Sequence, residues 1–224
     1  MPGMARSVVL AGAPRCLRCQ FSPRWCICAG EEAITCPLQV DVLIHRREFN
    51  RPTSTGRLIN RVMPASRCHL FRREEPPKRE SIVSPERTLW ILHPRGDPVP
   101  AGADPGHLQV LLLDGSWRES VHMAQAVAPW GRLVCLPASG PGRYQLRTHE
   151  YAGKYSTVES LLMLLAALGL AQAEARLRLQ FELHVYAGLR ARGAKARAEE
   201  FLASSPIREA FPELLARLHE RRPR

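Results

Sequence analysis

The chain lacks the long apolar stretches of a membrane protein, because no uninterrupted hydrophobic run approaches the roughly 20 residues of a transmembrane helix. Its first residues, MPGMARSVVLAGAPRC, contain only a brief apolar patch, which is too short for a secretory signal peptide. Global disorder is excluded in turn, since 45% of the 224 residues are hydrophobic. We therefore expect a cytoplasmic protein with one sizeable packed domain and no membrane partner.

The chain also lacks the even-numbered, evenly spread cysteines of a disulfide framework. Its seven cysteines are odd in number and gather towards the N-terminus, where four occur as Cys16-x2-Cys19 and Cys26-x-Cys28. Four thiolates match a structural zinc site in ligand type and number, and no histidine or carboxylate in the set suggests a catalytic metal. The sequence therefore predicts structural zinc at these four positions. The remaining cysteines are expected to be ordinary thiols: Cys36, Cys68 and Cys135.

Acidic residues are scarce beside basic ones, with 21 aspartates and glutamates against 32 lysines and arginines. The formal charge of +11 and an isoelectric point near 10.0 favour a polyanionic partner, because each neutralised phosphate releases counterions. A GC-rich genome, which favours arginine codons, would explain the same bias without such a partner. Contact with nucleic acid is therefore one of two explanations for the charge.

The stretch from Leu108 to Trp117, LQVLLLDGSW, is a short apolar run that ends in an acid, a glycine, a hydroxyl and a tryptophan. Such a run predicts a strand of a parallel sheet that is covered on both faces. Ligands gather at the carboxyl ends of such strands. Asp114 lies at this end, Gly115 permits a sharp turn and Ser116 can cap the next helix. The competing interpretation makes Asp114 a plain turn residue and Trp117 part of the core.

Further strands and helices alternate along the chain, which predicts an α/β domain with a largely parallel sheet and a helical C-terminal part. Strands are expected at residues 39–45, 88–93 and 132–136, and helices at 116–128, 161–170, 173–189 and 207–219. Another helix is expected to begin near Pro52 and Thr53 and to end before Pro64. Residues 67–85 are polar and contain prolines, so we expect an exposed connection there.

Two loops carry more chemistry than a connection needs. The turn before the helix that ends at Pro64 contains hydroxyls and Gly56, so its backbone N–H groups can hold an anion, although ordinary capping explains it equally well. The second loop interleaves basic residues with tyrosines, as phosphate contact and base stacking require: Arg143, Tyr144, Arg147, Lys154 and Tyr155.

Two further features lie in the C-terminal half of the chain. Ser156 and Glu159 match a capping box for the helix that follows them. The basic run at residues 190–197 is either an RNA contact or a solvated face.

Taken in order, these motifs resemble the DTW-domain family. The D-x-T-W signature of that family appears as Asp114-Gly115-Ser116-Trp117, with serine in place of threonine. The four-cysteine cluster matches the bacterial members. An upstream family segment, H-x-x-E-x-x-R-x-(S/T)-N-T-G-R-L, appears as His45, Glu48, Arg51 and Ser54-Thr55-Gly56-Arg57-Leu58, with serine where asparagine is common. Downstream segments appear as Gly142-Arg-Tyr144-Gln-Leu-Arg147, which lacks the serine of the family, and as Ser156-Thr157-Val-Glu159-Ser160.

The resemblance implies a SPOUT-like α/β fold with a knotted backbone at residues 38–224, preceded by a zinc-binding segment at residues 1–37. It also implies an activity, because family members transfer the 3-amino-3-carboxypropyl group of S-adenosylmethionine to N3 of a uridine in tRNA. The tRNA would contact Arg57, Arg143, Tyr144 and Lys154. The donor would contact Thr55, Gly56, Leu113, Asp114, Ser116, Trp117, Leu136, Arg147, Tyr155, Ser156 and Thr157. We expect a monomer without an obligate protein partner.

Within that activity, Asp114 is the expected catalytic residue. It would either accept or orient the N3 proton, or bind the amino group or ribose of the donor. Arg147 would pair with the donor carboxylate or with a tRNA phosphate, and Trp117 would form a pocket wall or part of the core. Two rival functions fit the same sequence: a SPOUT-class RNA methyltransferase, and a zinc-containing RNA-binding module without catalysis.

Overall fold

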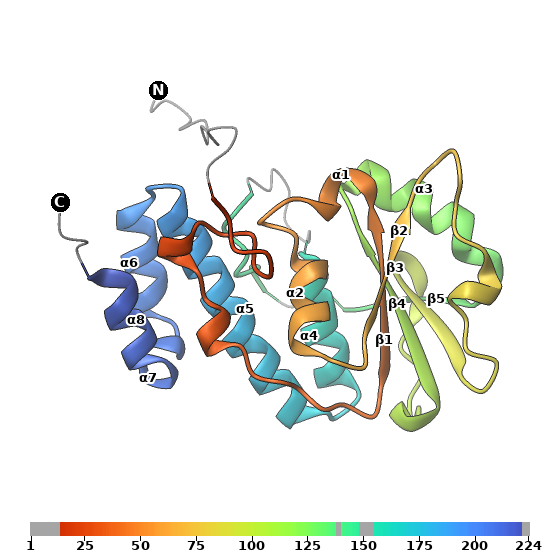
Figure 1. The fold of residues 1–224 in the computed structure, drawn as a ribbon. Coiled ribbons are helices and arrows are strands. Elements are labelled where there is room, and N and C mark those ends of the chain that lie inside the picture. The colour runs from red at the N-terminus through yellow and green to blue at the C-terminus, as the bar shows by residue number, and fades with distance from the viewer. Residues whose placement is uncertain (1–13, 138–139, 148–154, 221–224) are drawn as a thin grey trace.

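In a computed structural model, which describes residues 14–137, 140–147 and 155–220, the chain folds around a parallel sheet with strand order β2-β1-β4-β3-β5 (Figure 1). Every pair of neighbouring strands is parallel. The strands are β1 (Gln39–His45), β2 (Arg67–Phe71), β3 (Thr88–Pro98), β4 (Leu108–Asp114) and β5 (Arg132–Cys135). The predicted α/β class with a parallel sheet is confirmed, while the knotted SPOUT-like topology stays a prediction.

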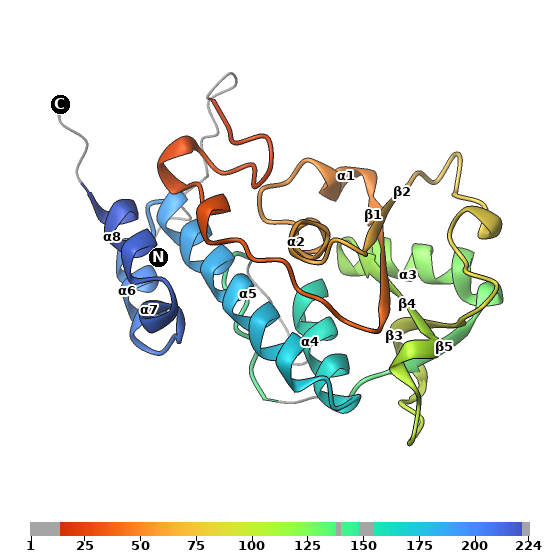
Figure 2. The ribbon, with the colours of Figure 1, turned by 60° about the horizontal axis from the view of Figure 1, so that its bottom comes forward.

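Helices cover both faces of this sheet, with α2 and α4 on one side and α3 on the other, and α5 packs against α2 and α4 on the side away from the sheet (Figures 1 and 2). Alternate residues of the central strands face these two layers, as strand geometry requires. Val42 and Leu112 join the cluster that contains α2, whereas Leu43 and Leu111 join Met123 of α3. The helices are α1 (Arg46–Phe49), α2 (Thr55–Val62), α3 (Trp117–Val127), α4 (Thr157–Ala167), α5 (Ala171–Ala191), α6 (Lys195–Ala203), α7 (Ile207–Ala210) and α8 (Pro212–His219).

The connections from β1 and β4 leave the sheet in opposite directions. The chain passes from β1 through α2 to β2 at one edge, and from β4 through α3 to β5 at the other. Right-handed crossovers in opposite directions place their helices on opposite faces, as observed here. The adjacent carboxyl ends of β1 and β4 are therefore a topological switch point, where open α/β sheets bind ligands. In the register, Asp114 at the end of β4 lies beside Ile44 of β1.

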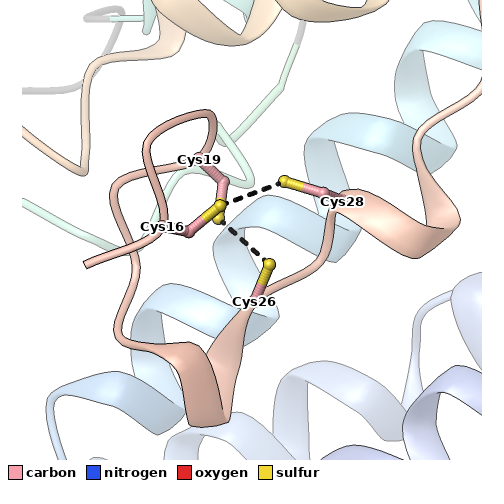
Figure 3. Close-up of side chains that lie close together, drawn as sticks. All are labelled: Cys16, Cys19, Cys26 and Cys28. Atoms are coloured by element: carbon pink, nitrogen blue, oxygen red, sulfur yellow. Dashed lines mark hydrogen bonds between the residues drawn. The ribbon is translucent and has the colours of Figure 1, made fainter. Parts of the chain in front are cut away.

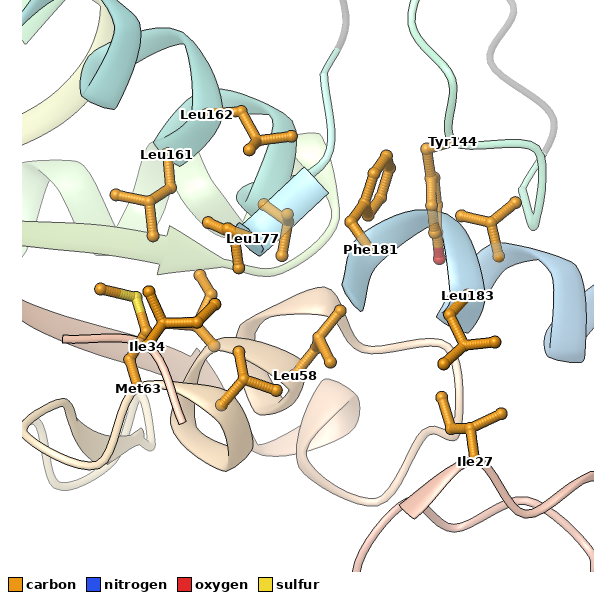
Figure 4. Packing of buried hydrophobic residues seen from close by; sticks show 14 of the residues in the cluster. Ile27, Ile34, Leu58, Met63, Tyr144, Leu161, Leu162, Leu177, Phe181 and Leu183 are labelled. Carbon is orange, nitrogen blue, oxygen red and sulfur yellow. The ribbon is translucent and has the colours of Figure 1, made fainter. Parts of the chain in front are cut away.

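The described cysteine-containing segment shares the core of the sheet domain. Ile27 packs near Leu183 of α5, and Ile34 packs near Met63, the residue that follows α2 (Figure 4). The side-chain amide of Gln180 donates to the Gly30 carbonyl at 2.9 Å. The N-terminal segment and α5 thus form one continuous hydrophobic cluster, to which α6, α7 and α8 add their buried faces. No helix of the described residues is long and apolar enough to cross a membrane.

A buried carboxylate organises the α3 side of the sheet. Asp41 of β1 is 0% exposed and accepts hydrogen bonds from Arg67 at 2.8 Å and Gln109 at 2.6 Å, and its carboxylate lies 3.0 Å from the His69 ring. Arg67 and Gln109 also donate to the Ile82 carbonyl, both at 2.8 Å. This network joins strands β1, β2 and β4 to the loop that follows β2, so the buried charge is fully partnered.

Three local predictions are wrong. Residues 67–71 form the edge strand β2 inside the predicted exposed connection. Polar residues such as Arg67 interrupt the apolar pattern of a strand, because they contact Asp41, which is distant in the sequence. Residues 207–219 form two helices, α7 and α8, because Pro212 lacks the N–H that would continue the first. The helix expected to begin near Pro52 begins at Thr55, because Ser54 supplies its cap.

Substitution of Asp41 tests the network. We expect Asp41→Asn to lower the free energy of unfolding by about 2 kcal/mol, because the half-exposed Arg67 and the His69 ring lose an ionised hydrogen-bond acceptor. Asp97→Asn, at an exposed pair with Arg132, is the control and is expected to cost less than about 1 kcal/mol. Urea denaturation followed by circular dichroism measures both, and equal values would contradict the assigned role of Asp41.

The same variant has an expected pH dependence. Burial acts to raise the pKa of the Asp41 carboxyl, but hydrogen bonds from His69, Arg67 and Gln109 outweigh it and hold the pKa below its ordinary value. The ionised group therefore contributes stability above the unfolded pKa, and this contribution is lost as pH falls through the folded pKa. The stability difference between wild type and Asp41→Asn should accordingly shrink below about pH 4.

Candidate active site

The end of β4 is joined to two helices through the Asp114 carboxylate. The Ser54 hydroxyl donates to Oδ2 at 2.7 Å and the Thr157 hydroxyl donates to Oδ1 at 2.6 Å, so each oxygen accepts one hydroxyl. Asp114 is 6% exposed. A Cβ on Gly56 would lie 2.8 Å from the carboxyl carbon, so only glycine allows α2 to approach this closely. The carboxylate is therefore held in one orientation by residues far apart in the sequence.

Both helices that contact Asp114 begin beside it. Ser54 is the N-cap of α2 and accepts from the Arg57 N–H at 3.2 Å, while Ser156 and Glu159 form the predicted capping box of α4. The positive ends of both helices thus lie near the Asp114 carboxylate and stabilise its negative charge. The N-terminal caps of both helices, of which the one at Ser156 was predicted, accordingly place polar groups at the end of β4.

Tyr144 is fixed by hydrogen bonds at both ends. The Glu159 carboxylate accepts from the Tyr144 N–H at 3.0 Å, and the Tyr144 hydroxyl donates to the Thr53 carbonyl at 2.7 Å. Burial raises the pKa of this phenol to about 12, so it remains a neutral donor. The ring is 6% exposed and stacks with Phe181, which leaves no face for a nucleobase. Its position suits a structural support of the site.

A buried glutamate positions Arg147. Glu48 is 1% exposed and forms ion pairs with Arg147 and, at 2.7 Å, with Arg51. Burial would lower the pKa of Arg147, but the neighbouring Tyr144 and Glu48 raise it. The guanidinium therefore keeps its charge at the edge of the pocket, where its remaining N–H groups can bind an anionic ligand group.

These groups surround one pocket at the switch point. Most of the residues predicted to bind the donor line it: Thr55, Leu113, Asp114, Trp117, Arg147, Tyr155, Ser156 and Thr157. Gly56 lies against Asp114 below the pocket, Ser116 caps α3 and faces a neighbouring groove, and Leu136 packs on the core. Trp117 is 49% exposed, so its assignment to the core is wrong.

The residues predicted to contact tRNA do not gather in one place. The Arg57 guanidinium lies over the Phe49 ring and donates to the Phe49 carbonyl at 2.9 Å. Arg143 pairs with Glu182 at 3.0 Å. Lys154 lies outside the described residues, and the buried ring of Tyr144 is unsuited to base stacking.

Several pocket residues were not predicted from the sequence. His93 lies in the middle of β3, where the pairing with β5 is irregular, and it lines the pocket; burial and the neighbouring Arg95 lower the pKa of its imidazole, which favours the neutral form at neutral pH. It is the last residue of the strand predicted at residues 88–93, and this was the available signal, since ligands gather at strand ends. The other unpredicted lining residues are Thr53, Leu92, Pro94, Gly115, Ser120 and Ser160.

The four predicted metal ligands lie together (Figure 3). The sulfur atoms of Cys16 and Cys28 are 3.6 Å apart, and those of Cys19 and Cys26 are 3.8 Å apart. Zinc bonded to four sulfurs at about 2.3 Å in tetrahedral geometry places the sulfurs about 3.8 Å apart. These two distances match that geometry, and all four sulfurs lie within 4.8 Å of one another, so the cluster could hold a zinc ion.

The thiols of the cluster differ in acidity. Burial acts to raise the pKa of Cys16, but backbone hydrogen bonds from Cys19 and Arg18 outweigh it and lower the pKa to about 6. Burial raises the pKa of Cys19 to about 11 and also raises that of Cys28. Only a cation among the sulfurs would favour four thiolates together, as zinc does.

The cysteine cluster belongs to the helical side of the molecule. Trp25 lies between the guanidinium groups of Arg24 and Arg190, at 5.1 and 5.0 Å from the ring centre. The Phe21 ring contacts the His184 ring of α5 at 5.1 Å between centroids. None of the four cysteines lines the pocket at the end of β4, which agrees with a structural site.

The fold and the pocket define an α/β protein with a candidate ligand pocket at the switch point of a parallel sheet. The sequence model of the DTW domain matches residues 13–187, more than half of the chain, and the chain belongs to this family. The resemblance drawn from the motifs is thereby confirmed. The match begins before Cys16 and ends in α5, so it includes the cysteine cluster and every segment of the pocket.

A curated relative from Drosophila melanogaster, tRNA-uridine aminocarboxypropyltransferase 2, is 24% identical to the chain over 154 residues. The match covers 64% of this chain and 61% of the relative, so less than two thirds of the relative is represented. No solved structure matches the chain.

Metal analysis tests the zinc prediction. We expect purified wild-type protein to contain about one zinc ion per chain, and Cys16→Ser/Cys19→Ser to contain almost none, because two of four ligands are lost. Cys36→Ser/Cys135→Ser, which removes two cysteines outside the cluster, should retain the metal. Equally low zinc in wild type and in the first variant would overturn the prediction.

Proposed function

We propose that the protein is a tRNA-uridine aminocarboxypropyltransferase, which transfers the 3-amino-3-carboxypropyl group of S-adenosylmethionine to N3 of a uridine. The observation that carries the proposal is a strand-end pocket that presents a carboxylate, Asp114, and a guanidinium, Arg147. The amino-acid end of the donor carries an ammonium and a carboxylate, so two opposite charges match it. The relative named above supports the same reaction.

The remaining pocket residues suit the rest of the donor. Leu92 and Leu113 offer apolar surface for an adenine ring, and the hydroxyls of Thr55 and Ser156 can bind a ribose. When bound, the donor would supply an electrophilic methylene carbon next to its sulfonium. The bond from this carbon to N3 of the uridine would form as its bond to sulfur breaks, methylthioadenosine would leave, and the N3 proton would pass to solvent. Because the methyl carbon on the same sulfur competes, the chain must align the longer arm with N3 of the uridine.

Alignment is the role that we assign to Arg147 and Asp114. Arg147 binds the donor carboxylate and Asp114 binds the donor ammonium, so the aminocarboxypropyl arm is held at both substituents. Both oxygens of Asp114 already accept hydroxyls from Ser54 and Thr157, which favours an orienting role over acceptance of the N3 proton. Asp114 thus contributes by fixed charge and position.

The cysteine cluster has a separate, structural role in this proposal. Zinc held by the four cysteines would fix the N-terminal segment against α5, away from the reacting groups. Free thiolate ligands require a reducing compartment, and we place the reaction in the cytoplasm for that reason.

Nucleoside mass spectrometry tests the reaction. Purified protein incubated with S-adenosylmethionine and unmodified tRNA should yield aminocarboxypropyluridine and methylthioadenosine. Asp114→Asn is expected to lower the rate about a hundredfold, because it removes the charge that orients the donor. Asp104→Asn, in an exposed loop, is the matched control and should retain the wild-type rate.

The product distinguishes this proposal from its rivals. A methylated nucleoside with S-adenosylhomocysteine would identify a methyltransferase instead. tRNA binding without any calorimetric signal for S-adenosylmethionine would identify a binding module and overturn the proposed activity.

The positioning of Arg147 is tested through its buried partner. We expect Glu48→Gln to raise the KM for S-adenosylmethionine about tenfold with a smaller effect on kcat, because Arg147 loses the charge that holds it. Arg147→Lys should raise the same KM, since lysine lacks the planar fork of arginine. Arg132→Lys, on the exposed side of β5, is the control. An unchanged KM in both test variants would remove Arg147 from the donor site.

A further inference from the structure

A second groove borders the active pocket across the start of α3. Four arginines line it, Arg46 and Arg47 from α1, Arg73 from the loop after β2, and Arg118 from α3. Two glutamates, Glu74 and Glu119, are its acidic lining residues. We call these four arginines and the hollow between them the α3-side groove. Its excess of cations makes it a binding surface for a polyanion.

The arginines of the groove are largely available to a ligand. Among the described residues, Arg46, Arg73 and Arg118 take part in no ion pair, and Arg47 reaches Glu119 only at 3.8 Å with 70% of its side chain exposed. Glu119 is engaged elsewhere, since it lies 3.0 Å from the His45 ring and accepts from the Ser116 N–H at 2.8 Å. This contrasts with Arg147, Arg143 and Arg67, whose guanidinium groups pair with buried carboxylates.

The charges of the groove act together on its one fully exposed acid. The pKa of Glu74 is lowered by a hydrogen bond from its own backbone and then by the charges of Arg46, Arg73 and Arg72. The three arginines therefore produce a positive potential at the same point of the surface. An incoming phosphate would meet that potential at the position where Glu74 now lies.

The groove and the active pocket meet at consecutive residues. Ser116 lines the groove, whereas Gly115 and Trp117 line the pocket. Residues from the end of the sheet where α1 follows β1 and α3 follows β4 line both of them, and Figure 1 shows that these two connections lie at the same end. A strand of nucleic acid bound in the groove would thus lie next to the pocket, because the two linings adjoin at the start of α3.

Exposed aromatic side chains flank the same edge. Among the described residues, Trp117 at 49% and Phe49 at 38% are the large exposed hydrophobics besides Leu17. Phe49 ends α1 and Trp117 begins α3, so the two lie on the elements that also carry Arg46, Arg47 and Arg118. Arginines beside exposed aromatic rings are the combination that binds single-stranded nucleic acid, since phosphates pair with the cations and bases stack on the rings.

We propose that the α3-side groove binds the phosphate backbone of a single-stranded tRNA loop, with Trp117 contacting a base at the pocket entrance. The inference rests on the proposed function and places its RNA substrate on the molecule. It also moves the expected RNA contacts away from Arg57 and Arg143, whose guanidinium groups are held by internal contacts. The donor is then held on the α2 and α4 side of Asp114, and the RNA arrives from the α3 side.

The test is the salt dependence of tRNA binding by the full chain. For Arg46→Gln/Arg73→Gln/Arg118→Gln we expect affinity for bulk tRNA to fall at least about tenfold at low salt. The slope of log affinity against log salt should fall by about 2, because each lost contact with a single strand removes about 0.7. Affinity for S-adenosylmethionine, measured by calorimetry, should stay within about twofold of wild type, since no groove arginine lines the pocket.

A matched control removes the same charge elsewhere. Arg176→Gln/Arg208→Gln/Arg217→Gln neutralises three exposed arginines on α5, α7 and α8 and should leave both the affinity and the slope near wild type. An equal loss in this control would show that net charge alone governs binding and would overturn the groove. Unchanged tRNA binding in the groove variant would overturn it as well.

The outcomes separate the groove from the proposed function. If wild-type protein forms the modified nucleoside and the groove variant binds tRNA as wild type does, the groove is wrong and the function stands. If wild-type protein binds S-adenosylmethionine but no tRNA, the RNA substrate itself is wrong and the groove falls with it.

Discussion

The two hydroxyl contacts of Asp114 are the constraint on which the rest of the pocket depends. The Asp114 carboxylate accepts hydrogen bonds from Ser54 at the start of α2 and from Thr157 at the start of α4. One side chain thus links the end of β4 to the first turns of both helices. Gly56 allows the close approach, because a Cβ would enter the volume of the carboxylate. The geometry of β4, α2 and α4 is therefore set by a charge that the helix ends also stabilise.

Buried carboxylates organise the structure repeatedly, and each one holds a segment distant in sequence. Glu48 holds Arg147, Glu159 accepts from the backbone of Tyr144, and Asp41 joins β2 to the centre of the sheet. Removing one partner from such a pair costs far more than an exposed pair is worth, because a buried charge would remain unpaired. Residues 143–147, between β5 and α4, are thus attached to the sheet domain by polar contacts as well as by the buried side chains of Tyr144 and Leu146.

How much the sequence predicts depends on how local each feature is. The strand ending at Asp114, the capping box at Ser156 and the four-cysteine cluster follow from residues within a few positions of one another, and the structure contains all three. The edge strand β2 escapes prediction because its polar residues face Asp41, which lies 26 positions from Arg67. The pairing of Glu48 with Arg147 spans 99 positions, and no local pattern indicates which arginines are held by such contacts. The sequence therefore predicted much of the pocket lining but not the residues that position it.

The distribution of paired and available arginines has a consequence for the geometry of the proposed transfer. A displacement at carbon requires the nucleophile to approach from the side opposite the leaving group. If the donor lies between α2 and α4, with its carboxylate on Arg147, the leaving sulfur lies on that side and the uridine must enter from the other. The groove along α3 is on that other side, and its arginines remain available because the acids that could neutralise them are engaged or few. In the proposed transfer the sheet end would thus hold the donor in the pocket and the RNA in the groove, with Trp117 at the boundary between them.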